Sequence, residues 1–308
     1  MSENKHNIHK ISIVGMGALG LLYGAHILKH KGADALTYVM DKERAVKYQD
    51  RDFLVNGETM RFHLTTAEDA KPADLLMVAV KYTGLKAALD EMKNCIGPDT
   101  IIISVLNGIS SEEIIGERYG KDNIIYTVAQ GMDAMKFGDR LQYTRMGELH
   151  IGIIKGQKEE NLDRLTAFFD EIEMPYVKEE DILYRMWSKF MLNVGVNQTC
   201  MVYGTTYAGV LAKGEANRTM FAAMREVLAI ANTEGIGLSE QVINQYMEIL
   251  KTLNPESTPS MGQDRINKKP SEVDMFAGTV MELGRRHGIH VPANEFLYDR
   301  VKEIEKEY

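Results

Sequence analysis

The stretch Lys10–Gly20, "KISIVGMGALG", decides how the first half of this chain is expected to fold. A β-branched run is followed at once by glycines spaced G-x-G-x-x-G at the start of a helical stretch. Gly15 permits a tight turn, Gly17 lets the backbone approach a pyrophosphate, and Gly20 lets the helix close on the strand. The helix N-terminus presents free N–H groups and its positive dipole end to the phosphates. The pattern predicts the opening unit of a dinucleotide-binding domain.

Strand-like runs alternate with amphipathic stretches as far as about Val177. In chain order the runs are "ISIV", "ALTYVM", "LLMVAV", "TIIISVL", "NIIYTVA" and "ELHIGII". This alternation predicts an α/β domain with a mainly parallel sheet. The segment "FLVNGETMRFHL" is interpreted as an inserted hairpin that turns at Asn56-Gly57.

The second half of the chain lacks such runs and shows long helical patterns. They cover Ile182–Tyr203 and Lys213–Thr233, and the end from Ser271 to Tyr308 is also helix-rich. An all-α domain is therefore expected after a boundary in "YVKEEDI". We expect a Rossmann-type dinucleotide-binding domain in residues 1–178 and a helical substrate and catalytic domain in residues 179–308.

The composition of the chain excludes several classes of protein. Its 308 residues suffice for two domains, and a net charge of −8 without a Lys/Arg-rich block argues against nucleic acid as a partner. Two cysteines provide neither a disulfide framework nor a metal-ligand spacing, so no metal is expected. The start "MSENKHNIHK" lacks the apolar core of a signal peptide, and no apolar run approaches the ~18 residues that span a membrane. We expect a cytoplasmic protein without a membrane partner.

Polar residues follow three of the predicted strands. An aspartate at the position of Asp41 usually accepts hydrogen bonds from the adenosine ribose, which favours NAD. Lys42 and Arg44 follow at once and could hold the 2′-phosphate of NADP instead, while an aspartate there also serves as a helix N-cap. Lys81 and Asn107-Gly108 follow the next two strands, where ligands gather in open α/β sheets, although Asn-Gly is equally typical of turns. The choice between NAD and NADP stays open.

The stretch "KFMLNVGVN" places polar residues in an apolar helical pattern. Lys189, Asn193 and Asn197 are spaced i, i+4, i+8 and share one stripe of the predicted helix. Buried polar groups need partners. The partner could be another part of the chain or a ligand, and the stretch alone leaves both open.

Taken together, these motifs resemble the ketopantoate reductase (2-dehydropantoate 2-reductase) family over nearly the whole chain. The resemblance rests on "GMGALG", "VKYTG", "LNGI", "MWSKFMLNVGVN", "PSMGQD" with "PSEVDMFAG", and "HGIHVPAN". It implies an N-terminal Rossmann domain followed by an all-α domain of the 6-phosphogluconate dehydrogenase C-terminal-like type. It also implies NADPH-dependent reduction of 2-dehydropantoate to (R)-pantoate on the route to pantothenate and coenzyme A. A small 2-keto acid is the expected substrate, and a homodimer is compatible with this family.

The resemblance also implies roles for individual residues. Lys189 matches the catalytic lysine, and Glu272 matches the active-site glutamate. Positions that match substrate-binding residues are Asn107, Lys189, Asn193, Asn197 and Ser260. The glycine motif, the end of the second strand and the resemblance together assign cofactor binding to Gly15, Met16, Gly17, Ala18, Leu19, Gly20, Asp41, Lys81, Asn107 and Ala134.

The chemistry makes the polar stripe intelligible. When hydride attacks the C2 carbonyl of a 2-keto acid, negative charge grows on its oxygen. A protonated Lys189 would stabilise that charge and deliver the proton. Desolvation should bring its pKa down from a free value near ~10.4. Glu272 could orient Lys189 or the substrate hydroxyl and offset part of the cost of a buried cation.

Two positions depart from the family pattern. A further substrate-binding asparagine, expected about ten residues after Asn197, is Tyr207, and Asp41 replaces the basic residue that often binds the 2′-phosphate. A D-2-hydroxy acid dehydrogenase of broader specificity, using NADH, is therefore the alternative. A non-catalytic dinucleotide sensor is a third class, but it predicts a degraded catalytic set, whereas Lys189 and Glu272 are both present.

Overall fold

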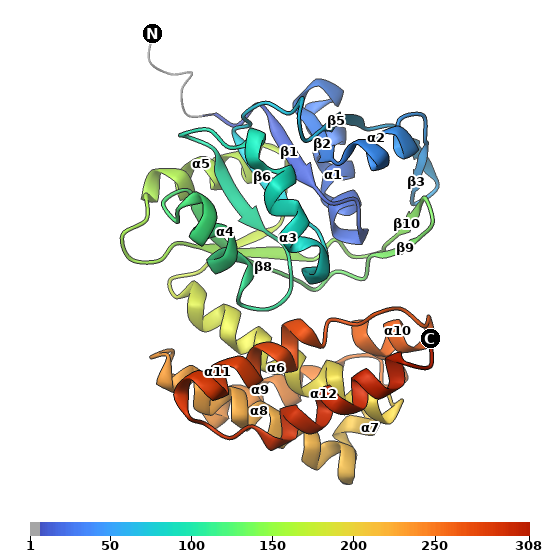
Figure 1. Ribbon diagram of the computed structural model, residues 1–308, viewed down its shortest axis with the longest axis vertical. Coiled ribbons are helices and arrows are strands. Elements are labelled where there is room, and N and C mark those ends of the chain that lie inside the picture. Colours follow the sequence, from blue (N-terminus) through green and yellow to red (C-terminus); the bar gives the residue numbers. More distant parts are fainter. Residues whose placement is uncertain (1–6) are drawn as a thin grey trace. The chain divides into compact units, whose positions relative to one another are not determined.

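The computed structural model in Figure 1 describes residues 7–308. Positions 1–6 of the opening segment "MSENKHNIHK" lie outside the described residues. The chain divides into two compact units, and each is described by itself. One contains the residues up to Asn107 with Ser111–Ile182, and the other contains Gly108–Ser110 with Leu183–Tyr308. Strands and helices alternate in the first unit and helices build the second, so the predicted α/β domain followed by an all-α domain is confirmed.

The first unit is built on a mainly parallel sheet. In spatial order its strands are β12 (Tyr176–Lys178), β11 (Glu148–Gly152), β8 (Ile124–Gln130), β7 (Ile101–Ser104), β6 (Leu75–Val78), β1 (Ile11–Val14), β2 (Leu36–Met40) and β5 (His63–Thr66). β1 pairs in parallel with β2 on one side and with β6 on the other, whereas β11 is antiparallel to β8. The chain proceeds outward from β1 in both directions. Open α/β sheets bind ligands beyond the carboxyl ends of their strands at such a switch point.

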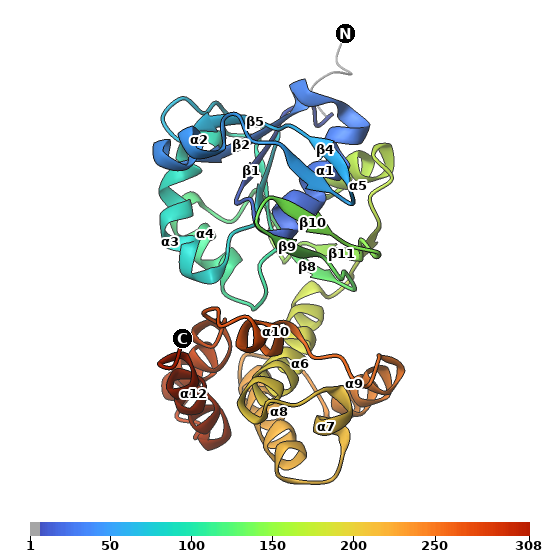
Figure 2. The same ribbon diagram turned by 90° about the vertical axis from the view of Figure 1, so that its right-hand side faces the viewer.

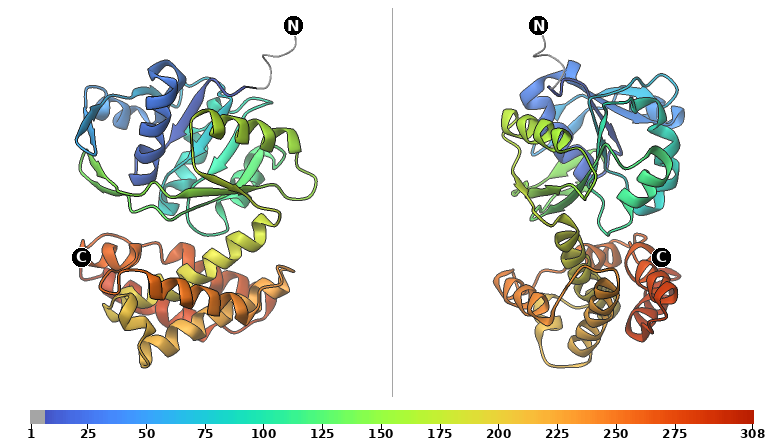
Figure 3. Two further views of the ribbon diagram at one scale, coloured as in Figure 1. Left: turned by 180° about the vertical axis from the view of Figure 1, so that it is seen from behind. Right: turned by 90° about the vertical axis from the view of Figure 1, so that its left-hand side faces the viewer.

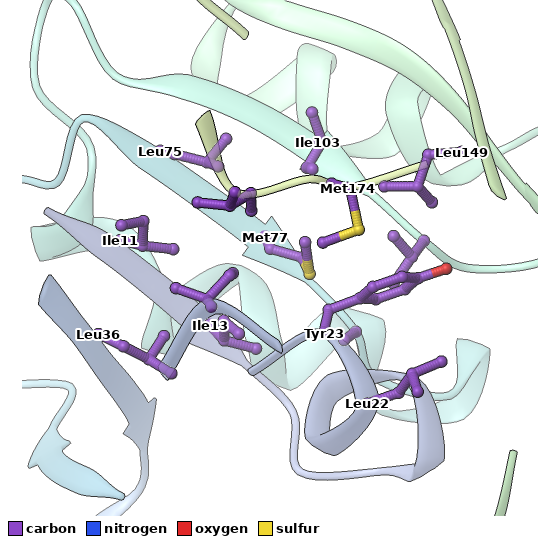
Figure 4. Packing of buried hydrophobic residues seen from close by; sticks show 14 of the residues in the cluster. Ile11, Ile13, Leu22, Tyr23, Leu36, Leu75, Met77, Ile103, Leu149 and Met174 are labelled. Atoms are coloured by element: carbon purple, nitrogen blue, oxygen red, sulfur yellow. The ribbon is translucent and has the colours of Figure 1, made fainter. Parts of the chain in front are cut away.

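Helices cover both faces of this sheet (Figure 2). They are α1 (Ala18–Lys31), α2 (Lys42–Tyr48), α3 (Tyr82–Glu91), α4 (Ser111–Tyr119) and α5 (Glu159–Glu171), with the short 3₁₀ helices η1 (Ala33–Ala35) and η2 (Lys93–Cys95). α1 and α5 lie on one face, and α3 and α4 lie on the other (Figures 2 and 3). Because the strands are covered on both sides, they are nearly continuous apolar runs. Ile13, Met77 and Ile103 belong to one buried cluster with Tyr23 of α1 (Figure 4).

The segment predicted as one hairpin divides between two sheets. The smaller sheet contains, in spatial order, β4 (Glu58–Met60), β3 (Phe53–Val55), β10 (Arg140–Gln142) and β9 (Met135–Phe137). β3 and β4 turn at Asn56-Gly57 as predicted, where φ is +48° and +86°. The end of the segment was assigned wrongly, because it forms β5 and pairs with β2 of the main sheet. Alternation within a segment does not specify which distant strand becomes its partner.

The second unit is helical. Its elements are α6 (Ile182–Tyr203), α7 (Tyr207–Leu211), α8 (Glu215–Thr233), α9 (Glu240–Thr252), α10 (Ser260–Ile266), the π-helix η3 (Asp274–Gly278), α11 (Thr279–His287) and α12 (Pro292–Glu305). α6 has the predicted bounds, and the helix expected from Lys213 begins at Glu215. α8 packs against α7, α9, α11 and α12. Within the described part of the chain, none of the helices combines the length and apolar character that crossing a membrane requires.

Candidate active site

The glycine turn after β1 is built so that side chains are excluded from it. Gly15 has φ +108°, and a Cβ there would lie 2.5 Å from the Ala79 carbonyl oxygen. A Cβ at Gly20 would lie 2.0 Å from the oxygen of Gly15, so only glycine lets α1 begin against the turn. Gly17 is exposed and is the N-cap of α1, with no side chain that caps the helix. Backbone N–H groups of the first helical turn therefore have no side-chain cap, and such a turn has the form that accommodates a pyrophosphate in dinucleotide-binding domains.

The other residues of this turn pack its underside. Met16, Ala18 and Leu19 are half-buried against the core cluster of the first unit. Tyr38 of β2, which was not predicted as part of this turn, has a buried hydroxyl that donates to the carbonyl of Gly20 at 2.7 Å. A Cβ at Gly24 would lie 1.8 Å from that hydroxyl oxygen. Gly20 and Gly24 lie one turn apart on α1, and this spacing in the sequence could have predicted that a side chain from another element packs there.

Asp41 occupies the N-cap of α2. Its Oδ1 accepts the backbone N–H of Arg44 at 2.8 Å, and its Oδ2 accepts the Nε–H of the same residue. The pKa of Asp41 is lowered, first of all by this backbone hydrogen bond. The capping role considered for Asp41 is therefore present, and a carboxylate that uses two of its lone pairs keeps others for a ribose. Arg44 also donates to Glu91 at the end of α3.

The remaining residues that are predicted to bind the cofactor follow the carboxyl ends of neighbouring strands. Lys81 is exposed at the N-cap of α3 after β6, and Asn107 is half-buried after β7. Because β1, β6, β7 and β8 are adjacent and parallel, the glycine turn, Lys81 and Asn107 lie along one edge of the sheet. Ala134, half-buried between β8 and β9, follows the next strand along this edge.

A buried polar network missed by the sequence analysis lies behind Asn107. Ser104 of β7 donates to Ser111 at 2.9 Å, and Ser111 donates to Glu112 at 2.7 Å. The backbone N–H of Leu106 donates to Ser104 at 3.4 Å. Burial raises the pKa of Glu112 to about 7, so part of this network carries a proton near neutral pH. The network supports the segment that carries Asn107.

In the helical unit, Lys189 and Glu272 lie within electrostatic reach of each other. Burial lowers the pKa of Lys189 from 10.5 to about 8, Glu272 opposes this shift, and Arg185 adds to it. Glu272 lies just before η3, and its carbonyl accepts the N–H groups of Met275 and Phe276 at 3.0 Å each. The fold thus joins a lysine and a carboxylate from distant parts of the chain, and the lysine can lose or gain a proton near neutral pH.

The polar stripe of α6 continues towards Ser260. Asn193 and Asn197 are each 8% exposed, and the Nδ2 of Asn197 donates to the Oγ of Ser260 at 3.3 Å. Ser260 is the exposed first residue of α10. α6 packs closely against α8 because residue 195 is a glycine. A Cβ at Gly195 would lie 2.5 Å from the side chain of Met224 in α8. The structure therefore gives part of the stripe a protein partner.

Tyr207 lies beside this cluster. Its backbone N–H donates to the carbonyl of Ser257 at 3.0 Å, just before Ser260. Burial raises the pKa of its phenol, and the Cys200 thiol adds to that shift. Cys200 follows Asn197 by one turn of α6, and burial raises its own pKa to about 12. The phenol of Tyr207 and the buried thiol of Cys200 thus lie within electrostatic reach of each other.

Gln198 ties α6 to the segment that carries Glu272. Its Oε1 accepts the N–H of Ala277 in η3 at 2.9 Å, and its Nε2 donates to Val194 and to Asn294. Asn294, which is fully buried, donates to Glu226 at 2.7 Å. None of these residues was predicted from the sequence, although Asn294 lies in "HGIHVPAN". π-helical turns often occur at functional sites, and Gln198 supports this one.

The described residues contain no group of three or more His, Cys, Asp or Glu side chains that could hold a metal ion. A Rossmann-type unit with a glycine turn suited to a pyrophosphate, and a helical unit with a half-buried lysine near a half-buried glutamate, are features of a dinucleotide-dependent oxidoreductase. Residues 11–156 match the family model described as "Ketopantoate reductase PanE/ApbA", and residues 181–305 match "Ketopantoate reductase PanE/ApbA C terminal". The chain belongs to the ketopantoate reductase family, and it is accordingly an oxidoreductase that acts on CH–OH groups with a nicotinamide dinucleotide.

Similar proteins support this membership along the whole chain. A 2-dehydropantoate 2-reductase of Streptococcus pyogenes serotype M3 is 25% identical over 288 residues, which cover 92% of this chain and 93% of that protein. The Lactococcus lactis enzyme of the same name is 24% identical over 310 residues, which cover 96% and 98%.

Solved structures share the fold. The ketopantoate reductase of Ralstonia eutropha superposes with a TM-score of 0.81 at 23% identity, covering 97% of this chain and 99% of that one. A ternary structure of D-mandelate dehydrogenase with NADH and anilino(oxo)acetate superposes with a TM-score of 0.85 at 22% identity, covering 97% and 98%. At such identities the likeness extends to the fold alone, and enzymes with different substrates share it.

Proposed function

We propose that this protein reduces 2-dehydropantoate to (R)-pantoate with a reduced nicotinamide dinucleotide, a step towards pantothenate and coenzyme A. The observation that supports this proposal most strongly is the half-buried Lys189, whose pKa is brought to about 8 beside Glu272. The names of the relatives from Streptococcus pyogenes and Lactococcus lactis point to the same reaction. Residues 179–308 would supply the substrate-binding side chains, and residues 1–178 would bind the dinucleotide.

The proposed roles follow from charge and protonation. A bound reduced nicotinamide supplies hydride to C2 of the keto acid. Lys189, in its ammonium form, stabilises the charge that grows on the C2 oxygen and then delivers its proton there. Glu272 keeps Lys189 more basic than burial alone would allow. Asn193 and Asn197, with Ser260, bind the carboxylate and hydroxyl oxygens of the substrate.

For the dinucleotide, we propose the glycine turn Gly15–Gly20 as the pyrophosphate site, with Asp41 at the adenosine ribose. Lys81 and Asn107 would contact the cofactor, Asn107 also contacting the substrate, and Ala134 would pack against the cofactor. In dinucleotide-binding domains the residue at this position faces the ribose 2′-hydroxyl, and because it is the carboxylate Asp41 in this chain, we propose NADH as the preferred cofactor. A homodimer is proposed by analogy with a structure described as a dimeric ketopantoate reductase from Staphylococcus aureus.

The second candidate is a D-2-hydroxy acid dehydrogenase of broader specificity. Tyr207 favours it, because its ring lies near the Cys200 thiol at a position where the family resemblance implies an asparagine. A site that bonds the terminal hydroxyl of ketopantoate rejects analogues without it, whereas an aromatic ring offers apolar contact area.

One panel of assays tests both candidates. Oxidation of NADH and NADPH is followed with ketopantoate, 2-ketoisovalerate, 2-ketoisocaproate and phenylglyoxylate, with reactions lacking keto acid as blanks. If the protein is a 2-dehydropantoate 2-reductase, kcat/KM should be highest with ketopantoate. Equal or higher kcat/KM with another keto acid would move the assignment to the broader dehydrogenase, and no turnover with any of the four would contradict both.

A further inference from the structure

Arg44 lies between two carboxylates that come from different helices. Its Nε donates to Asp41, at the start of α2, and its Nη2 donates to Glu91, the last residue of α3. The side chains of Arg44 and Asp41 are 41% and 45% exposed, but that of Glu91 is only 9% exposed. The second carboxylate oxygen of Glu91 is buried without a hydrogen-bond partner. The fold therefore keeps a poorly solvated carboxylate in place against this one guanidinium.

The position of the cluster formed by Asp41, Arg44 and Glu91 is relevant to the choice between NADH and NADPH. Asp41 directly follows β2, and in a dinucleotide-binding domain the residue there faces the adenosine ribose. α3 packs against β2, which brings Glu91 to the same place. Two carboxylates and one guanidinium leave a formal charge of about −1 where the 2′-phosphate of NADPH would bring roughly −1.5 to −2 more. The same cluster would not oppose the uncharged 2′-hydroxyl of NADH.

Arg44 is also, with Lys42, one of the two residues that could hold the 2′-phosphate according to the sequence. To bind that phosphate, its guanidinium would have to leave Asp41 and Glu91 and expose two carboxylates to the incoming anion. The cost of that exchange falls mainly on Glu91, because its burial limits hydration by water once the arginine has left.

We propose that Glu91 is a specificity-determining residue of the cofactor site, which disfavours NADPH by holding Arg44 away from the 2′-phosphate. This inference rests on the proposed function, since it assumes that the adenosine end of the cofactor lies at Asp41. It adds a residue that lies outside the β2–α2 loop and acts through another side chain.

The variant Glu91→Gln tests the proposal. The amide is isosteric but uncharged, so it releases part of the hold on Arg44 and removes one negative charge. The ratio of kcat/KM for NADPH to that for NADH should rise at least ~10-fold, mainly through the KM for NADPH. If Glu91 only held α2 and α3 together, Glu91→Gln would instead change kcat/KM for both cofactors by the same factor or lower the melting temperature of the protein.

Nucleotide fragments provide a readout that does not depend on the keto acid. The Kd of 2′,5′-ADP, which carries the 2′-phosphate, should fall in Glu91→Gln at least ~5-fold, while that of 5′-ADP stays within ~2-fold. If the protein binds these fragments as expected but reduces no keto acid, the proposed reaction fails while the role of Glu91 stands. If wild type already binds 2′,5′-ADP more than ~10-fold tighter than 5′-ADP, Glu91 does not exclude the phosphate and the inference is overturned.

Matched controls separate this role from a general charge effect. Asp90→Asn removes the same charge one position away, where Asp90 pairs with Arg118 at the surface, and should leave the cofactor ratio within ~2-fold of wild type. Glu91→Gln combined with Arg44→Ala should lose the gain for NADPH. An equal gain in Asp90→Asn, or a gain that persists without Arg44, would refute the role. If Glu91→Gln does not fold, Glu91→Leu removes the buried carboxylate and the same shift is expected.

Discussion

The glycine turn after β1 lies in the first unit and the polar stripe of α6 lies in the second, and the groups proposed to bind ligands differ in kind between them. In the turn the groups proposed to bind the dinucleotide are backbone amides, and Gly15 and Gly20 leave no room for a side chain. In the helical unit the proposed catalytic and substrate-binding groups are side chains, and burial together with Glu272 sets the pKa of Lys189. A backbone site is local in sequence, whereas a side-chain site is assembled from distant segments. The two should therefore respond differently to substitution.

The largest effect is expected at Lys189. Lys189→Ala removes the proposed proton donor and should lower kcat by at least ~10²-fold, the usual scale of general acid catalysis. The Kd of the dinucleotide should stay nearly unchanged, because the proposed dinucleotide site is formed by residues of the other unit. Steady-state kinetics and nucleotide titration measure the two quantities. Retention of more than about half of the activity would remove Lys189 from the mechanism.

A glycine variant should show the opposite pattern. At Gly17 an added Cβ meets the protein only at 3.7 Å, so Gly17→Ala is compatible with the fold. It places a methyl group where the backbone should approach the pyrophosphate, and the Kd of the dinucleotide should rise roughly tenfold or more. Gly214→Ala is the control, since a Cβ there meets no atom within 4 Å. An unchanged Kd in Gly17→Ala would show that the turn does not bind phosphate.

The coupling between Lys189 and Glu272 should appear in the pH dependence of kcat. The ammonium form is the active one, so activity falls as the pH rises through the Lys189 pKa of about 8. Glu272 raises that pKa, so in Glu272→Gln the decline should begin at lower pH. Profiles recorded across about pH 6 to 10 test this, with the exposed Glu248 changed to Gln as control. If kcat declines at the same pH in Glu272→Gln as in wild type, the two residues are not coupled.

The smallest effect is expected at Tyr207. Tyr207→Asn restores the residue type implied by the family resemblance, and the kcat/KM ratio for ketopantoate over 2-ketoisovalerate should rise by up to roughly tenfold. Tyr203→Phe, which removes a hydroxyl that contacts Thr219 instead, should leave the ratio unchanged. A wild-type ratio already above ~10⁴ would contradict relaxed specificity, because discrimination of that size requires a dedicated hydrogen bond to the missing group.

Local periodicity predicted much of the fold. The β-branched runs around Ile13 and Ile103 lie in strands because a covered parallel sheet is apolar on both faces. The turn at Asn56-Gly57 was predicted because those residues tolerate positive φ. The smaller sheet was missed, because β3 pairs with a strand far along the chain and no local pattern names that partner.

The sequence by itself determined the glycine turn, since its spacing and its absence of side chains are local properties. It also determined that Lys189, Asn193 and Asn197 share one helical stripe. Only the tertiary structure decided what those groups meet: it brought Glu272 to Lys189 and Ser260 to Asn197. It likewise decided that Arg44 is held by Glu91. Electrostatic and hydrogen-bond partners depend on distance in space, and packing of apolar surface sets that distance.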